Sequence, residues 1–432
     1  MARESSSTAR SKASSDYDVA AFLDIGTAKT ACLIVRCEAS GARTVLGAGL
    51  RSTRGLKAGV VVEMDGVEQA IRGAVNDAEA AAGLPISDVR LAVACGRLRA
   101  QTFAADAQIA RHHVTPADVD RVLQAGAAFA EKDGRILLDL EAIGFRVDGM
   151  PCGPAAIGLG GRMLGADLVA VTADEAPLVN LMHVVSRAEL ATASLVASPY
   201  ASALAATSLR DRHAGVLCVD LGAGTTQIAM FAEGHLLLCD VIPVGGNHIT
   251  FDIARTFGTT LPEAERIKRC YGTLLGTAAE LGEVFTYSSR PWADHMDDSS
   301  GHTGGVRTAS ATRGDLQSLI DARMASLFAH IAERLERTSL PQYARRMMVL
   351  TGGASLLPGT PEAAAAFFRQ PVEMGLVPEF AGLSAGFSGP HMAAVAGLAL
   401  APPGYHVRMS GPAQDADEQG YLQRVGRWLR GS

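Results

Sequence analysis

The stretch with the clearest chemical potential in this 432-residue sequence is Val216–Phe231, VLCVDLGAGTTQIAMF. An apolar run ends in Asp220, a turn of small and hydroxylated residues follows, and a second apolar run continues to Phe231. Two such runs around a glycine-containing turn predict a β-hairpin. Gly222 and Gly224 permit close backbone approach to an anion, and the N–H groups of such a turn can bind phosphate. Asp220 could face hydrated Mg2+ there. The same pattern also fits an ordinary tight hairpin with a solvated aspartate.

The same layout occurs a second time, in Val19–Arg36, VAAFLDIGTAKTACLIVR. Its first apolar run carries Asp24, and the small turn residues are followed by Lys29 and a second apolar run. Self-similarity at long spacing indicates a duplicated architecture. We therefore expect two related half-domains, each presenting an aspartate-tipped phosphate hairpin to a shared cleft.

Three further stretches fit the same plan. In Met347–Pro358, an apolar strand leads into Gly352 and Gly353, where the backbone could approach adenine and its ribose. Glu265 and Lys268 are spaced i, i+3 on one helix face and could offer an acceptor and a donor to the ribose, or could form a solvated ion pair. The turn 245–247 has backbone N–H groups that could face the phosphates.

These stretches define the expected nucleotide site, with no residue assigned a catalytic role. The expected ligand residues are Asp24, Gly26, Thr27, Ala28, Lys29, Asp220, Gly222, Gly224, Thr225, Thr226, Gly246, Asn247, Glu265, Lys268, Gly352 and Gly353. Asp24 and Asp220 would bind the metal through water.

In this order, the four principal stretches resemble the actin/Hsp70/hexokinase ATPase superfamily. Local strings resemble one branch of it, the FtsA family of bacterial division proteins: DIGTAKT (24–30), RGLKAGVV (54–61), GLGGRMLGADL (158–168), VIPVGGNHITFDIARTFG (241–258) and VLTGGASLLPG (349–359). The resemblance covers about Val19 to Leu400 and resumes at the C-terminal tail. It implies an α/β, actin-like ATPase fold in which two duplicated ribonuclease-H-like lobes surround a nucleotide cleft and carry an inserted α/β subdomain. It also implies ATP and Mg2+ as cofactors.

The residue at position 198 bears on the rate of ATP hydrolysis. In Hsp70-like relatives, a glutamate that helps to position the attacking water precedes the corresponding proline. This chain has Ser198 before Pro199, and FtsA-like proteins resemble it in lacking the acid. A serine without an activating partner is a poor general base. We therefore expect ATP binding with weak or no ATPase activity.

Composition bounds the protein class. The chain has 48% apolar and 19% charged residues and a net charge of −6, which is typical of a globular protein and gives no sign of nucleic-acid binding. Seven cysteines without a C-x-x-C pair indicate buried thiols in a reducing cytosol. No apolar run reaches transmembrane length.

The expected division of the chain follows from these patterns and from the resemblance. Residues 1–16 would be a disordered arm, 17–84 and 173–212 the first lobe, 85–172 the inserted subdomain, 213–243 and 338–384 the second-lobe core, 244–337 its upper subdomain, and 385–400 a helix that closes the first lobe. Helices are expected at Val67–Ala82, Pro116–Glu131, Ala173–Ser186, Ser194–Ser208, Ile249–Phe257 and Asp315–Arg337, and a mobile loop at 287–314.

The C-terminal tail has its own pattern. Residues 401–418 are rich in Pro, Gly and Asp and predict a flexible linker. In 419–432, the apolar residues Tyr421, Leu422, Val425, Trp428 and Leu429 fall in an arc of roughly 120°, opposite Arg424, Arg427 and Arg430. This pattern predicts an amphipathic helix in a membrane interface. Docking on the protein itself or in a partner groove is the alternative.

The resemblance implies a function as well. It suggests an ATP-binding, self-assembling division protein that tethers FtsZ polymers to the cytoplasmic membrane, peripheral on the inner face at the division site. Arg323 lies nearest the family's position for the FtsZ C-terminal peptide, although an arginine on a solvated helix face is the alternative there. Later division proteins would be further partners. The alternatives are a PilM-like cytosolic pilus-assembly protein and a kinase or chaperone-type ATPase of the same superfamily, neither of which explains the basic amphipathic tail.

Overall fold

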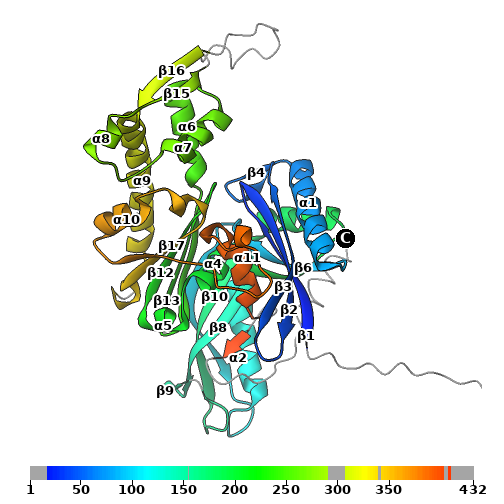
Figure 1. Cartoon of the computed structure of the whole chain (residues 1–432). Helices are drawn as coiled ribbons and strands as arrows, with labels where there is room; N and C mark the ends of the chain where they lie inside the picture. Colours follow the sequence, from blue (N-terminus) through cyan, green and yellow to red (C-terminus); the bar gives the residue numbers. More distant parts are fainter. Residues whose placement is uncertain (1–16, 154, 290–306, 339–341, 403–406, 410–432) are drawn as a thin grey trace, which may run out of the picture.

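The computed structural model describes residues 17–153, 155–289, 307–338, 342–402 and 407–409. Two five-stranded sheets form the centre of the molecule, with the inserted subdomain at one end and a largely helical subdomain at the other (Figure 1). The expected arms at 1–16 and 419–432 lie outside the described residues. No helix in the described part of the chain is long and apolar enough to span a bilayer.

The first lobe contains a sheet of strand order β11-β6-β1-β2-β3. Its strands are β1 (Tyr17–Ile25), β2 (Lys29–Glu38), β3 (Arg43–Ser52), β6 (Asp88–Val93) and β11 (Ala191–Ala197). The helices α1 (Met64–Ala82) and α3 (Glu175–Arg187) accompany it, with the short strands β4 (Leu56–Lys57) and β5 (Val60–Val61). Helix α1 packs against β3 where Gly49 faces the carbonyl of Ala74, an approach that a Cβ atom would prevent.

The second lobe repeats this topology in the order β14-β13-β12-β17-β18. Its strands are β12 (Val216–Leu221), β13 (Thr226–Ala232), β14 (His235–Ile242), β17 (Met347–Thr351) and β18 (Val372–Met374). In both sheets, three consecutive antiparallel strands are followed by two parallel strands on the free side of the first one. The predicted duplication of the two hairpins is therefore confirmed.

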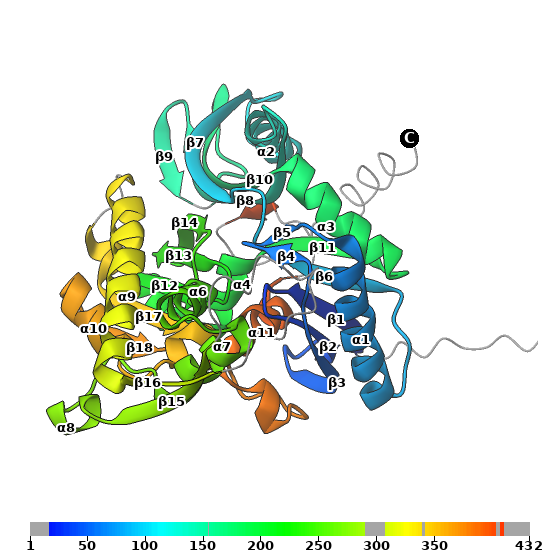
Figure 2. The ribbon, with the colours of Figure 1, turned by 90° about the horizontal axis from the view of Figure 1, so that it is seen from above.

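Two helices fill the space between the sheets, as the view from above shows (Figure 2). These are α4 (Ser198–Ala206) and α11 (Ala393–Leu400), and they pack closely because Gly397 of α11 lies against the carbonyl of Ala201. Helix α11 also contacts β1 and β2, as expected for the closing helix. One hydrophobic core joins Val216, Cys218 and Phe231 of the second lobe to the first lobe. The seven cysteines are free thiols.

The inserted subdomain has a sheet of order β19-β8-β10-β7, with β9 paired to one end of β8. Its elements are β7 (Arg99–Gln108), α2 (Pro116–Ala130), β8 (Arg135–Val147), β9 (Met150–Gly153), β10 (Met163–Asp174) and β19 (Val407–Met409). Helix α2 begins as predicted, because the Thr115 N–H and hydroxyl both donate to Asp118, which closes a capping box. The subdomain has its own core.

The upper subdomain is built on the long helix α9 (Arg313–Glu336), whose buried stripe includes Leu316, Ile320, Leu327, Ile331 and Leu335. Around it lie α6 (Gly246–Phe257), α7 (Leu261–Tyr271), α8 (Ala278–Leu281), β15 (Val284–Ser289) and β16 (Arg307–Thr312). The remaining helices are α5 (Leu209–Ala214) and α10 (Thr360–Phe368), with short 3-10 turns at Gln342–Arg345, Gly353–Leu356, Ala385–Phe387 and Pro390–Met392.

Four expectations about elements are corrected. Strand β6 pairs in parallel with β1, so the first lobe continues past the expected boundary at residue 84. Residues 194–197 belong to β11 rather than to a helix, since Pro199 sits in the first turn of α4. The expected loop 287–314 contains the end of β15 and all of β16, which pair. Within the expected linker 401–418, residues 407–409 form a strand on β8.

Candidate functional site

The two predicted hairpins turn toward each other at the ends of equivalent strands. Gly26 N donates to Lys29 O in the first turn, and Gly222 N donates to Thr225 O in the second, both at 2.9 Å. The turns touch: a Cβ atom on Gly224 would lie 2.4 Å from the Thr27 hydroxyl oxygen. Glycine at this position therefore allows the two lobes to approach each other directly at the site.

Asp220 is contacted by α4 and by the strand β17 next to it. The Ser202 hydroxyl of α4 donates to its Oδ2 atom at 2.5 Å. On the neighbouring strand, Asp220 pairs with Thr351, and Gly352 follows with φ +87°. A Cβ on Gly352 would come within 2.2 Å of the Asp220 Oδ1 atom. Asp220 is 7% exposed, so this carboxylate has a fixed position at the base of the two turns.

Asp24, Lys29 and Asp220 form one electrostatic group. Burial raises the pKa of Asp24 to about 6, with Lys29 opposing the shift and Asp220 adding to it. Burial also raises the pKa of Asp220, against the Ser202 hydrogen bond and Lys29. Burial lowers the pKa of Lys29, while both carboxylates favour its charged form. The Lys29 ammonium also donates to the backbone carbonyl of His391. Two aspartates and one lysine from opposite lobes therefore share a single site.

The N-terminus of α6 is bonded to the second turn. Gly246 N donates to Gly222 O at 2.9 Å, and Asn247 N donates to Ala223 O at 2.8 Å. The expectation that these two amides face a phosphate is therefore wrong, because both are already used. Thr226 is also engaged: its buried hydroxyl donates to Val244 O at 2.8 Å.

Glu265 and Lys268 form the ion pair that the sequence offered as an alternative, at 2.6 Å. The pair is not simply solvated, because both side chains also bond to α6. The Thr250 hydroxyl lies 2.6 Å from Glu265 Oε2, and Lys268 Nζ lies 2.9 Å from the same hydroxyl and 3.2 Å from Gly246 O. The pair is thus attached to the element that carries the second turn.

An apolar hollow adjoins these groups. A small hollow lies between the second turn, α6, α9 and the turn after β17, and its lining includes Leu221, Gly246, Ile249, Met324 and Ala354. It places an apolar wall next to the groups expected to bind phosphate and ribose.

Arg323 also lines this hollow, but its guanidinium is already paired. Its Nε and Nη2 atoms lie 2.5 and 2.9 Å from the two carboxylate oxygens of Asp252, which is 7% exposed. The arginine therefore joins α9 to α6.

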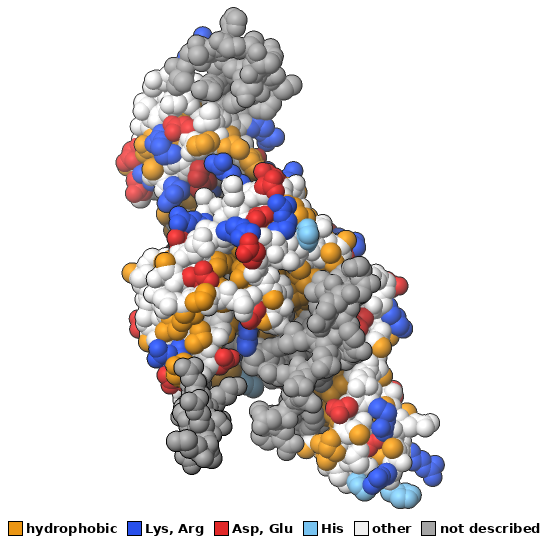
Figure 3. Space-filling model, turned by 90° about the vertical axis from the view of Figure 1, so that its right-hand side faces the viewer, with side chains coloured by type: hydrophobic (Ala, Val, Ile, Leu, Met, Phe, Trp, Pro, Cys, Tyr) orange, Lys and Arg blue, Asp and Glu red, His pale blue; other side chains and the backbone are white. Residues whose placement is uncertain are grey.

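On the face shown in Figure 3, basic and acidic side chains are interspersed over the surface.

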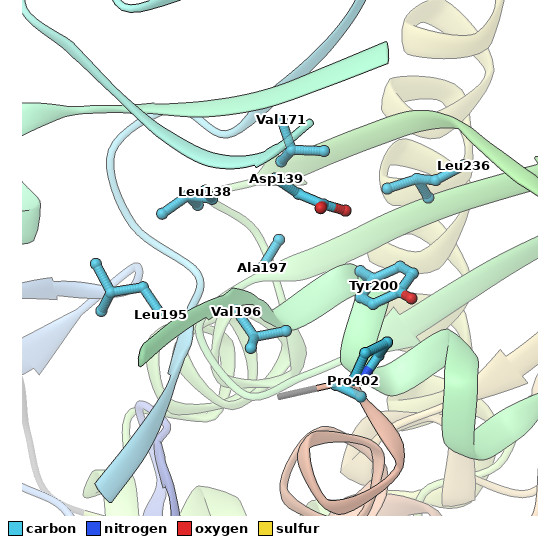
Figure 4. Close-up of a pocket in the computed structure, with 10 residues that line it drawn as sticks. Leu138, Asp139, Val171, Leu195, Val196, Ala197, Tyr200, Leu236 and Pro402 are labelled. Atoms are coloured by element: carbon cyan, nitrogen blue, oxygen red, sulfur yellow. The ribbon is translucent and has the colours of Figure 1, made fainter. Parts of the chain in front are cut away.

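A second cavity lies away from the hairpins, where the insert meets both lobes (Figure 4). It is small and partly open to solvent, and its mostly apolar lining includes Leu138, Asp139, Val196, Tyr200 and Pro402. None of the expected nucleotide ligands lines it. It is therefore separate from the site between the hairpins.

Four residues at the site were not predicted. Ser202 fixes Asp220, His391 accepts from Lys29 through its carbonyl, and Thr250 joins Glu265 to Lys268. The fourth is Gln227, which pairs with Asp220 across the hairpin and has a buried Oε1 atom with no hydrogen-bond partner. The hydroxyl of Ser198, a residue that the sequence did single out, also has no partner. Ser202 and Thr250 lie within helices that the sequence placed next to the site, so their proximity was the available signal. The position of His391 depends on a long-range contact.

Comparisons with known proteins agree with this architecture. The sequence model of "Cell division protein FtsA" matches residues 217–397, and that of "SHS2 domain inserted in FTSA" matches residues 95–172. The chain is similar in fold to a PilM–PilN type IV pilus biogenesis complex, with TM-score 0.62 and 18% identity over 88% of this chain and 97% of that one. It is also similar to MreB5 of Spiroplasma citri bound to ADP, with TM-score 0.51 and 14% identity over 88% and 95% of the two chains.

These structural similarities identify the fold as actin-like, as expected. The start of the insert match at residue 95 agrees with the placement of β6 in the first lobe. Among relatives in sequence, the cell division protein FtsA of Rhizobium meliloti (strain 1021) is 32% identical over 428 residues, 96% of this chain and 95% of its own length. The chain therefore belongs to the FtsA family of cell division proteins.

Proposed function

We propose that this protein binds ATP with Mg2+ between its two hairpins and tethers FtsZ polymers to the cytoplasmic membrane. The observation that carries the proposal is the convergence of two equivalent glycine turns from duplicated lobes, each with an aspartate at the end of its first strand, half-buried Asp24 and buried Asp220. Backbone N–H groups of such turns suit phosphates, and carboxylates suit Mg2+ and its water shell. FtsA family membership supports the role in division.

In this proposal each group has a distinct task. Bound Mg2+ would neutralise phosphate charge, and Asp24 and Asp220 would hold its water ligands. Lys29 would face the phosphates from the first turn, and Glu265 with Lys268 would face the ribose. Gly352 and Gly353 would let the backbone approach the base. Residue 198 is a buried serine rather than an acidic residue that could position the attacking water, so ATP hydrolysis should be slow.

Isothermal titration of the full-length protein with ATP and Mg2+ tests the nucleotide site. We expect Asp220→Asn to weaken binding at least tenfold, because it removes a charge next to the metal, whereas Asp120→Asn, an exposed carboxylate in the insert, should bind as wild type does. Absence of ATP binding to the wild-type protein, or equal affinities for all three, would refute this part of the proposal. Rapid multiple turnover would refute the assignment of slow hydrolysis.

The membrane part rests on the sequence of 419–432, which lies outside the described residues. We expect the full-length protein to co-sediment with vesicles that contain anionic lipid. Trp428→Glu should abolish this binding because it places a charge on the apolar arc. Gln423→Glu introduces the same charge off that arc and should retain most of the binding. Unchanged sedimentation of the Trp428 variant would remove the anchor from the proposal.

The FtsZ part can be tested by pull-down. We expect the protein to retain FtsZ and to lose most of it when the C-terminal peptide of FtsZ is deleted. Retention that is independent of the peptide would contradict the proposed mode of binding. Arg323 is the proposed contact, although its pairing with Asp252 means that a partner carboxylate would have to compete for the same guanidinium.

A further inference from the structure

The Thr250 hydroxyl is the point at which Glu265 and Lys268 meet α6. Thr250 is 6% exposed and lies in the second turn of the helix. Its single proton points to Glu265 Oε2 at 2.6 Å, and its lone pair accepts from Lys268 Nζ at 2.9 Å. A hydroxyl can donate one hydrogen bond and accept others at the same time, so this one group satisfies both members of the ion pair.

The same network reaches the second hairpin. Lys268 Nζ also donates to Gly246 O at 3.2 Å, and Gly246 N donates to Gly222 O at 2.9 Å. The ion pair on α7 is therefore connected through the first two turns of α6 to the glycine turn that follows Asp220. Thr250 lies at the centre of this connection, because it contacts both charged side chains.

We infer that Thr250 is a positioning residue for ribose recognition: together with Lys268, whose ammonium bonds to Glu265, Thr250 and Gly246, it holds the Glu265 carboxylate in position to accept from the sugar hydroxyls of a bound nucleotide. The inference rests on the proposed function, since it concerns the same site. An i, i+3 ion pair on an exposed helix face samples many rotamers and contributes little by itself. Charge-assisted hydrogen bonds to a buried hydroxyl restrict both side chains to one arrangement. Such preorganisation lowers the entropy cost of binding a ligand.

A purely structural role would have different consequences. Threonine hydroxyls inside helices often bond to the carbonyl four residues earlier, and Thr250 Oγ1 lies 3.4 Å from Gly246 O. Loss of that contact alone would change stability and would weaken all ligands alike. Loss of ribose positioning would instead reduce discrimination between nucleotides with and without sugar hydroxyls.

The test compares ATP with 2′,3′-dideoxy-ATP, both with Mg2+, by isothermal titration on the full-length protein. The readout is the ratio of the two dissociation constants. We expect wild type to prefer ATP by about tenfold, the scale of one to two hydrogen bonds to charged groups. Thr250→Val, which keeps the side-chain shape but removes the hydroxyl, should bring the ratio close to one. Thr250→Ser should restore the wild-type ratio.

Urea unfolding of each variant monitors folding, and Thr250→Ala replaces the valine variant if that one does not fold. A wild-type ratio in the hydroxyl-free variant would overturn the inference, as would a wild-type protein that binds both nucleotides equally. Failure of wild type to bind ATP at all would instead refute the proposed function, so the two failures are distinguishable.

Discussion

At the scale of single residues, the charged groups of the site lower the stability of the folded protein without nucleotide. Asp24, Lys29 and Asp220 are three charged groups in a largely buried setting. Burial raises the pKa of both aspartates and lowers the pKa of Lys29, which favours the neutral form of all three groups. Removing charges from water destabilises them unless they are paired or bound. In the proposed function, Mg2+ and the phosphates of ATP would interact with these groups and offset this destabilisation.

This cost predicts a pH dependence of stability without nucleotide. The pKa of Asp24 is about 6 in the folded protein against a usual value of 3.8, so between these pH values the folded state binds more protons than the unfolded state. The free energy of unfolding should therefore fall as pH rises from about 4 to 6, by at most about 3 kcal/mol from this group. Asp24→Asn should remove that contribution and stabilise the empty protein above pH 6.

Urea unfolding at several pH values, with Asp120→Asn as a control, measures the effect. The control should keep the wild-type slope because its carboxylate is exposed. Identical slopes for wild type and Asp24→Asn would show that Asp24 titrates normally in the folded protein.

The sequence identified the charged and glycine residues of the site because they follow short, strongly apolar strands at regular positions. It could not identify Ser202 or His391 as contacts of Asp220 and Lys29. Their bonds join residues 18 and 362 positions apart, and such contacts depend on how elements pack. The amides of Gly246 and Asn247 were misassigned because local sequence does not reveal which acceptor a free N–H will find.

At the scale of elements, close packing of α4 and α11 connects the two lobes. Gly397 lies so near to α4 that a Cβ atom would be 1.7 Å from the Ala201 carbonyl oxygen. We expect Gly397→Ala to lower the free energy of unfolding by about 3 kcal/mol, because the helices would have to move apart. Gly386→Ala, where a Cβ would meet nothing within 4 Å, should change it little. Urea unfolding distinguishes the two, and similar stabilities would contradict the close approach.

A second prediction concerns the pair that joins α9 to α6. Arg323→Ala leaves the buried carboxylate of Asp252 without its bidentate partner, so we expect a loss of about 2 kcal/mol in stability. The double variant with Asp252→Ala should lose less than the sum of the single variants, since the two side chains interact directly. Additive losses would show that the pair contributes nothing, which would favour a role for Arg323 toward a partner.

Helices were predicted best where caps and apolar periodicity coincide, as in α1, α2 and α9. The strand Ala191–Ala197 was missed because its small residues suit a helix equally well, and only pairing with β6 decides the matter. The insert boundary was displaced for the same reason, since the membership of β6 in the first sheet depends on non-local parallel pairing.

At the scale of the whole molecule, the duplicated lobes were predictable because the sequence repeats its hairpin.

The proposed anchoring also has a consequence at this scale. One amphipathic segment is a weak anchor, whereas assembly would multiply anchors and strengthen attachment without any new contact. We expect vesicle binding to rise steeply with protein concentration in the presence of ATP and Mg2+. A simple hyperbolic dependence, measured by co-sedimentation, would indicate that single molecules bind independently.

The pairing of β19 with β8 sets the greatest possible distance between the folded body and the amphipathic segment that begins near Tyr421. With Val407–Met409 fastened to the insert, only the 11 residues from 410 to 420 separate that point from Tyr421, a reach of at most about 40 Å. Measured instead from Leu400, the 20 residues from 401 to 420 would allow about 70 Å. If the segment from Tyr421 onward binds the membrane as proposed, the three-residue strand would shorten the greatest distance between that segment and its point of departure from the body by nearly half, and the tail would leave the body from the insert rather than from the first lobe.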